Sequence, residues 1–91
     1  MQEITAPLRQ AIESGRVVLG VRQCARALRE KEAKLIIIAN NCPDEYLRSQ
    51  KEVPVQEFPG SNVELGAACG KPFSVSVVAV LDPGKSSILN L

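Results

Sequence analysis

The sequence predicts an α/β fold, a three-layer α/β/α sandwich in which helices cover both faces of a small mixed sheet of four strands. One observation is the run Leu35–Ala39, whose apolar residues show no polar alternation and so indicate a strand covered on both faces. Another is that helical and extended segments alternate along the chain, which is typical of layered α/β proteins. With 91 residues, we expect a single domain spanning residues 1–91.

Each element follows from its own pattern of apolar and chain-breaking residues. Apolar residues that recur at helical spacing predict helices from Ile4 to just before Gly15, from Val21 to Leu28, from Pro43 onward and over Asn62–Cys69. The helix at Pro43 has room for no more than about three turns, and a capping box at residues 61–64 opens the last helix. Apolar or alternating runs predict strands at residues 16–19, 35–39, 53–58 and 73–80, with a short final strand at 88–89.

The composition is that of a soluble globular chain, with 45% hydrophobic and 23% charged residues. No apolar run approaches the roughly 18 residues of a membrane span, and the N-terminus lacks a signal pattern, so we expect a cytoplasmic protein that does not contact membranes. The three cysteines form no Cys-x-x-Cys pair and histidine is absent, so no metal site or disulfide framework is predicted. No cofactor is predicted either.

Two asparagines, Asn40 and Asn41, stand directly after the Leu35–Ala39 strand, at the edge of an open α/β sheet where ligands bind. A side-chain amide carries two donors and an acceptor in one plane, which suits it to hydrogen-bond the edge of a nucleobase. The alternative is that both residues merely turn the chain, as asparagine often does. Their spacing alone leaves both interpretations open.

Positive charge is concentrated between Arg16 and Lys34, where six basic residues stand against two acidic ones although the net charge of the chain is +1. Arg22, Arg26 and Arg29 fall on one face of the second predicted helix. This face is either a surface for nucleic-acid phosphates or an ordinary solvated helix face.

Several predicted loops form a candidate nucleic-acid site when they are taken together. The loops after the first two strands can lie side by side, and the entry to the 73–80 strand can complete the rim. The residues concerned are Gly20, Arg22, Gln23, Arg26, Asn40, Asn41, Asn62, Lys71, Phe73 and Ser74. They combine positive charge for phosphates, amides for base edges and an apolar ring for a splayed base, with few groups suited to catalysis.

Two other motifs suggest different chemistry. Gly84-Lys85-Ser86 is close to the end of a phosphate-binding loop, but the first glycine of that motif is missing and too few residues follow for its helix. Cys42 precedes the predicted helix at Pro43, where a thiolate would be stabilised, so the alternative function is a small thiol-dependent enzyme. Because the chain has no histidine to act as a base for this thiol, we expect no enzymatic activity.

Longer segments of the chain resemble a known family. They are Ser14–Gly20, Ala33–Pro43, Asn62–Lys71 and Asp82–Gly84. In this order they resemble the ribosomal protein family thirty-e of the archaeal and eukaryotic large ribosomal subunit, over nearly the whole chain. The resemblance implies the three-layer fold, a place in that subunit beside neighbouring ribosomal proteins, and binding to kink-turn RNA, in ribosomal RNA and in some members in the protein's own transcript. We expect a monomer when the protein is free.

The resemblance also implies which residues face the RNA. These are Gly20, Arg22, Asn41, Phe73, Ser74 and Val75, with Asn62 and Glu64 close by. Some relatives have arginine where this chain has Ser74, so one charged contact is absent here. Relatives also have a longer helix after the Asn-Cys-Pro motif, of which this chain lacks roughly two turns between Gln50 and Val53.

Overall fold

A mixed sheet of four strands forms the middle layer of the structure, a computed structural model that describes residues 5–86 and 88. The strands are β1 (Arg16–Leu19), β2 (Leu35–Ala39), β3 (Val55–Phe58) and β4 (Val77–Asp82), in the order β1-β4-β2-β3. β2 and β3 run parallel, whereas β4 runs antiparallel to both β1 and β2. The predicted mixed four-stranded sheet is therefore confirmed.

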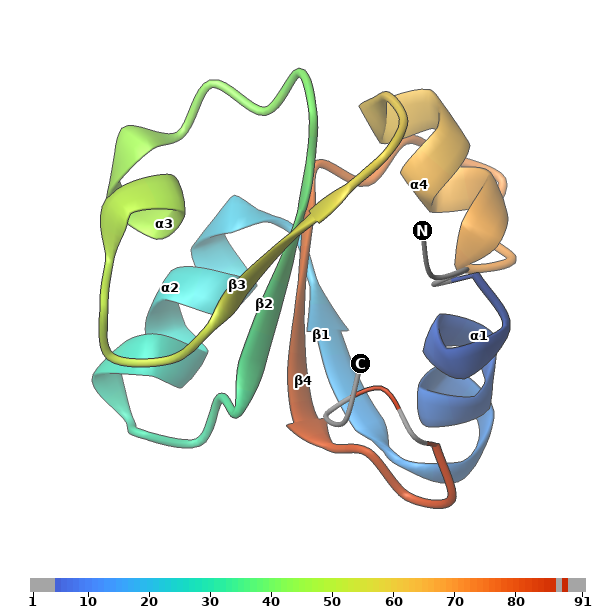
Figure 1. Ribbon diagram of the computed structural model, residues 1–91, viewed down its shortest axis with the longest axis horizontal. Helices are drawn as coiled ribbons and strands as arrows, with labels where there is room; N and C mark the ends of the chain where they lie inside the picture. The colour runs from blue at the N-terminus through green and yellow to red at the C-terminus, as the bar shows by residue number, and fades with distance from the viewer. Residues whose placement is uncertain (1–4, 87, 89–91) are drawn as a thin grey trace.

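Helices cover both faces of this sheet, as Figure 1 shows. α1 (Thr5–Ser14) and α4 (Asn62–Ala68) lie on one face, and α2 (Val21–Arg29) and α3 (Glu45–Ser49) lie on the other. All five residues of β2 are buried. Ile37 belongs to the core beneath α1 and α4, whereas Ile36 and Ile38 belong to the core beneath α2 and α3. The predicted three-layer sandwich is confirmed, because alternate side chains of one strand enter two separate cores.

Strand β4 begins later than predicted, at Val77 rather than at residue 73. Residues 73–76 form a loop in which Phe73 and Ser74 are exposed. The N–H of Val75 donates to the carbonyl O of Asn62 at 3.0 Å instead of joining a strand ladder. The alternation in this segment therefore reflects one buried side chain, that of Val75, and not a strand face.

Helix α3 is short and also begins later than predicted. It starts at Glu45 rather than Pro43, because a side-chain oxygen of Asp44 accepts a hydrogen bond from the N–H of Leu47 at 2.9 Å and caps the helix. Its five residues respect the predicted limit of about three turns. Leu47 is its only buried residue, and Tyr46 is 55% exposed, so α3 makes a thin contact with the core.

Other predicted boundaries also differ slightly from the structure. β3 begins at Val55 rather than at residue 53, after Pro54, which has no N–H to donate to a ladder. Ile88 takes a 3-10 helical conformation rather than the predicted strand, and its side chain is buried. Ile4, the first residue of one predicted helix, and Leu89, the last residue of the predicted final strand, lie outside the described residues.

Residues 5–86 and 88 contain neither a membrane-spanning helix nor a metal-binding cluster. None of the helices there has the length and apolar character needed to cross a bilayer. In the same part of the chain, no group of three or more His, Cys, Asp or Glu side chains is arranged to hold a metal ion.

Candidate nucleic-acid interface

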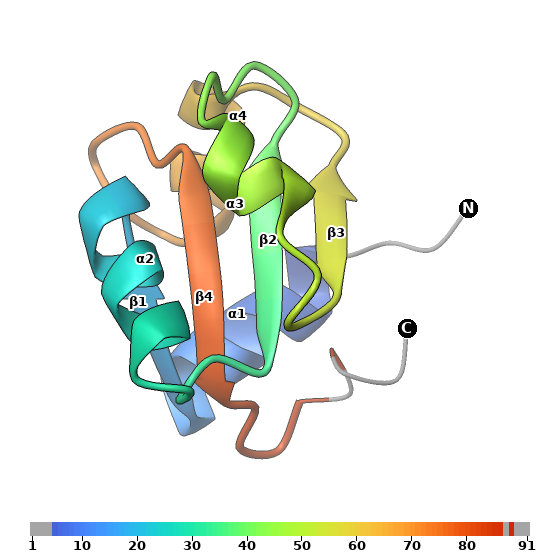
Figure 2. The same ribbon diagram turned by 90° about the vertical axis from the view of Figure 1, so that its left-hand side faces the viewer.

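The loops predicted to bind RNA meet at one edge of the sheet, the upper edge in Figure 2. Because β4 runs antiparallel to β1 and β2, the residues that enter β4 lie beside the residues that leave its two neighbours. The N–H of Gly20 donates to the carbonyl O of Val77 at 2.9 Å. The N–H of Ala39 donates to the carbonyl O of Ser76 at 2.9 Å. We call residues 20–23, 40–42, 59–62 and 71–76 together the loop edge.

A tight turn after β2 carries Asn40 and Asn41 at its two central positions. The N–H of Cys42 donates to the carbonyl O of Ala39 at 3.1 Å, which closes the turn. The N–H of Asn40 donates to the carbonyl O of Gly60 at 2.9 Å, which fixes the turn against the segment after β3. Both asparagines are exposed, so the turn presents two amides at the loop edge.

The amide of Asn41 reaches across to α4. Asn41 Oδ1 accepts a hydrogen bond from the N–H of Asn62 at 2.9 Å, and Asn41 Nδ2 donates to Asn62 Oδ1 at 3.2 Å. One N–H and one lone pair of the Asn41 amide remain for a ligand. The side chain of Asn40 hydrogen-bonds to no other residue within the described part of the chain. The two interpretations of this pair are therefore compatible, since its backbone turns the chain while its amides stay available.

Gly20 connects β1 to α2 in a conformation that favours glycine, with φ +95°. A Cβ at this position would meet no atom within 4 Å, so a ligand can approach the backbone here. α2 begins directly after Gly20 and has no side-chain cap, which leaves first-turn N–H groups without a side-chain acceptor. Arg22 and Gln23 lie in this first turn and are exposed. The start of α2 thus has the charge and the donors to bind a phosphate.

Some of the arginines on and near α2 are paired with carboxylates, so less positive charge is free than the sequence indicated. Nε of Arg26 donates to Glu30 Oε2 at 3.2 Å, and this hydrogen bond is the main cause that lowers the pKa of the Glu30 carboxyl. Arg16 lies 4.0 Å from a carboxylate oxygen of Glu32. Arg22 makes no ion pair with another described residue. It is therefore the α2 arginine at the loop edge whose charge stays free for a phosphate.

The start of α4 is fixed by a capping box, as predicted. Ser61 Oγ accepts a hydrogen bond from the N–H of Glu64 at 3.4 Å, and Glu64 Oε1 accepts one from the N–H of Ser61 at 3.1 Å. The Glu64 carboxylate thus holds the helix end in place. Because Asn62 contacts both Asn41 and Val75, this helix end also ties the turn after β2 to the segment before β4.

The segment before β4 lies directly on α4. A Cβ on Gly66 would come within 2.1 Å of the carbonyl O of Phe73, so this close approach requires glycine. Phe73 is 56% exposed and Val63 is 66% exposed, and both border a shallow groove of about 250 Å³. The other residues that line the groove are Ala67, Lys71, Pro72 and Ser74. An exposed phenylalanine ring beside a lysine suits stacking with a base and attraction to its phosphate.

Val75 differs from the other predicted contact residues because its side chain is buried. It is 3% exposed and belongs to the core that includes Leu65. Two residues that hold the turn after β2, Gly60 and Arg48, were not predicted. Their hydrogen bonds depend on how distant segments pack, and no local pattern in the sequence marks them.

The cysteines lie in the interior of the protein. Cys42 is buried, and because Asp44 caps α3, the thiol does not stand at the helix N-terminus that the enzyme alternative requires. Burial raises the pKa of the Cys24 thiol to about 12 and that of the Cys69 thiol to about 11.

Gly84-Lys85-Ser86 forms a turn that packs against the end of α1, at the opposite end of β4 from the loop edge. The N–H of Lys85 donates to Ser14 Oγ at 3.0 Å, and the N–H of Gly84 donates to Asp82 Oδ1 at 2.9 Å. These contacts give the segment a structural role in closing the turn after β4.

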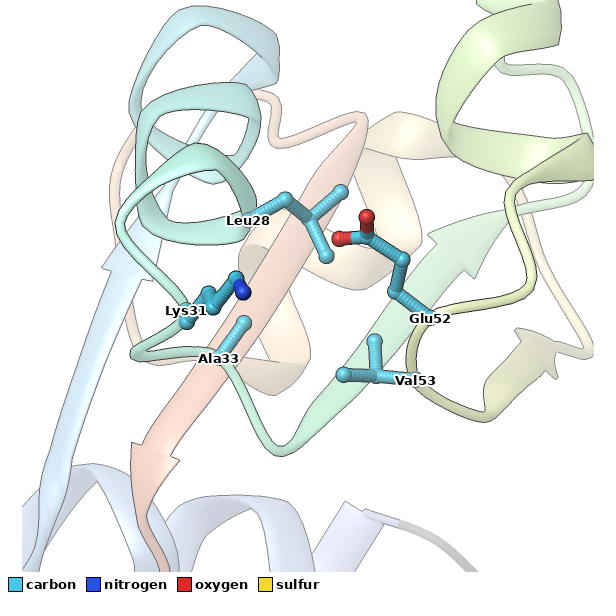
Figure 3. A pocket seen from close by; sticks show the side chains of 5 residues that line it. All are labelled: Leu28, Lys31, Ala33, Glu52 and Val53. Atoms are coloured by element: carbon cyan, nitrogen blue, oxygen red, sulfur yellow. The ribbon is translucent and has the colours of Figure 1, made fainter.

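A hollow of about 400 Å³ lies away from the loop edge, between the end of α2 and the connection from α3 to β3 (Figure 3). Leu28, Lys31 and Ala33 line it from one side, and Glu52 and Val53 line it from the other. It adjoins the segment that the sequence predicts to be shortened.

The chain matches a ribosomal protein family over almost its whole length. Residues 2–90 match the profile of the Ribosomal protein L7Ae/L30e/S12e/Gadd45 family, so the chain belongs to this family. It is 42% identical to large ribosomal subunit protein eL30 of Methanoregula boonei over 92 residues, which cover 98% of this chain and 95% of that protein. It is also 42% identical to eL30 of Methanococcus vannielii over 95 residues, which cover 98% of this chain and 90% of that protein.

These comparisons confirm the family that the sequence resembles. The matched relatives are named as ribosomal-subunit proteins and not as enzymes, which confirms the prediction that the chain is not an enzyme. The match with the Methanococcus vannielii protein extends over 95 residues, more than the 91 of this chain. That relative therefore has additional residues within the matched region.

Proposed function

We propose that this chain is a structural constituent of the large ribosomal subunit and binds kink-turn RNA through the loop edge. Membership of the family and the eL30 relatives support the ribosomal assignment. The observation that carries the RNA site is the meeting of three segments at one edge: the start of α2, the turn after β2 and the residues that enter β4.

The three segments supply complementary chemistry for a bulged RNA. Arg22 and the free N–H groups of α2 bind phosphate, the amides of Asn40 and Asn41 bind base edges, and the ring of Phe73 receives an unstacked base. Regular RNA helices hide their base edges in a deep groove, so such a set requires a site where bases are turned out. A kink-turn offers bases of that kind.

The proposal includes the setting in which the protein acts. Residues 1–91 form a single RNA-binding domain, which is monomeric when free and lies beside neighbouring ribosomal proteins in the cytoplasmic ribosome. Gln23, Lys71 and Ser74 lie exposed within the loop edge as further polar contacts, and Arg26, one turn further along α2, lies next to it.

A gel-shift comparison tests this function. The protein is titrated with a kink-turn RNA and with a straight RNA duplex of equal length and equal charge, at one salt concentration. We expect the kink-turn to bind at least about tenfold more tightly, the factor that one good base contact supplies. Equal affinities for the two RNAs would contradict the proposal, because phosphate charge alone would then explain the binding.

A further inference from the structure

We infer that Arg48 is a positioning residue of the RNA site and holds the Asn40–Asn41 turn from both ends. Its Nη2 donates to the carbonyl O of Ala39 at 3.3 Å and to the carbonyl O of Cys42 at 3.0 Å. These carbonyls belong to the first and last residues of the turn, which the hydrogen bond from Cys42 N–H to Ala39 O closes. One guanidinium group therefore locks the turn after β2.

The surroundings of Arg48 fix its guanidinium in turn. Nη1 of Arg48 donates to Glu57 Oε1 in β3 at 3.5 Å, and the side chain is 32% exposed. The preceding residue, Leu47, is fully buried, which anchors α3 to the core. Asp44 caps the same helix at its other end. The short helix α3 thus serves to place one arginine under the turn.

The chemistry of the contacts favours positioning over direct contact with RNA. Both N–H bonds of Nη2 are used on backbone oxygens, and Nη1 faces a carboxylate that offsets its charge. A guanidinium is planar and spreads its donors in a rigid fork, which lets it bridge two acceptors at once, whereas a lysine ammonium acts as a point charge. Arg48→Lys should therefore keep the charge but lose the bridge.

This inference rests on the RNA-binding function proposed above and has a test with two readouts. In salt titrations with a kink-turn RNA, Arg48→Lys and Arg48→Met should both bind roughly three- to tenfold more weakly than the parent, with an unchanged salt slope. In the RNA-free protein, hydrogen exchange at the N–H of Asn62 should accelerate in both, because this N–H reports the bond to Asn41 Oδ1. Exchange at the N–H of Glu64, which Ser61 caps, should not change.

The controls separate the possible outcomes. Arg16→Met, which removes an exposed arginine without a contact to the turn, should match the parent in both readouts. Adding Arg48→Lys to Asn41→Ala should cause a smaller further loss of affinity than Arg48→Lys causes in the parent, since the turn then has only the Asn40 amide to position. Glu57→Gln should weaken RNA binding and accelerate exchange at the N–H of Asn62 less than the Arg48 variants do. It replaces them in the test if they fold poorly.

Two results would overturn the inference. If Arg48→Met lowers the salt slope by about 0.7–0.9 while Arg48→Lys binds like the parent, Arg48 contacts a phosphate directly. If both variants bind like the parent and Asn62 exchange is unchanged, Arg48 does not position the turn although the proposed function stands. A parent that fails to prefer the kink-turn overturns the proposed function instead, and the exchange readout then still decides whether Arg48 holds the turn.

Discussion

The side-chain amides of Asn41 and Asn62 hydrogen-bond to each other across 21 positions of sequence. Asn41 Oδ1 also accepts from the N–H of Asn62, so two hydrogen bonds join the turn after β2 to the first residue of α4. The carbonyl O of Asn62 accepts from the N–H of Val75 in the segment before β4. Three segments of the loop edge are therefore linked in series through Asn62.

Arg22→Ala should weaken binding to a kink-turn RNA more than Arg29→Ala. Arg22 lies in the first turn of α2 at the loop edge, whereas Arg29 is the last residue of that helix. Each phosphate contact removed lowers the slope of log affinity against log salt by about 0.7–0.9, and we expect this decrease only for Arg22→Ala. Salt titrations of the two variants measure it. A larger loss from Arg29→Ala would mean that the RNA runs along α2.

Lys31→Gly should stabilise the protein. Lys31 has φ +59° at the end of α2, and the N–H of Glu32 donates back to the carbonyl O of Ala27 at 2.9 Å, an arrangement in which glycine is usual. Glycine relieves the strain of this conformation, but it also gains conformational freedom in the unfolded chain. The difference between the two effects should raise the free energy of unfolding by roughly 0.5–1 kcal/mol. Urea denaturation measures the change, with Lys34→Gly as a control that should bring no gain. A Lys31→Gly protein no more stable than the parent would contradict the prediction.

The stability of the protein should decrease in alkaline solution through Cys24. Burial raises the pKa of this thiol from 9.0 to about 12, so the unfolded chain releases the proton at a lower pH than the folded protein does. The contribution of the neutral thiol is therefore complete below pH 9.0 and is lost as the pH rises towards about 12. Urea denaturation at several pH values should show a steeper fall in the parent than in Cys24→Ala. Parallel curves for the two proteins would show that the thiol titrates normally.

The layers of the fold could be predicted because apolar spacing acts locally. The run Leu35–Ala39 carries no polar residue on either face of the strand, and a strand of that kind needs cover on both faces, which the two cores supply. The start of β4 could not be predicted in the same way. Phe73 and Val75 alternate like strand residues, but the backbone of this segment bonds to Asn62 and packs on Gly66. Such long-range contacts leave no local pattern.

The residues of the candidate site also differ in whether a local sequence pattern could predict them. Asn40, Asn41 and Gly20 could be found because each directly follows an apolar run that ends at the same edge of the sheet. The role of the Arg48 guanidinium could not be predicted, because it reaches the turn only after α3 folds back over β2. The pairing of Arg26 with Glu30 is local, at helical spacing of four residues, and the sequence could have indicated it.

Asn41→Ala should weaken kink-turn binding by about 10- to 100-fold, because it removes an amide that is already held in place and whose base contact is worth roughly 1–3 kcal/mol. The salt slope should stay unchanged, since no charge is lost. Asn40→Ala should cost less, because its backbone, which bonds to Gly60, keeps the turn in place without the side chain. Asn62→Ala should fall between the two, since it removes one hydrogen bond to Asn41 and keeps the other. Salt titrations of the three variants, with circular dichroism to check folding, give the order. If Asn41→Ala binds like the parent, or if Asn40→Ala is the weakest binder, the turn after β2 does not read the RNA through Asn41.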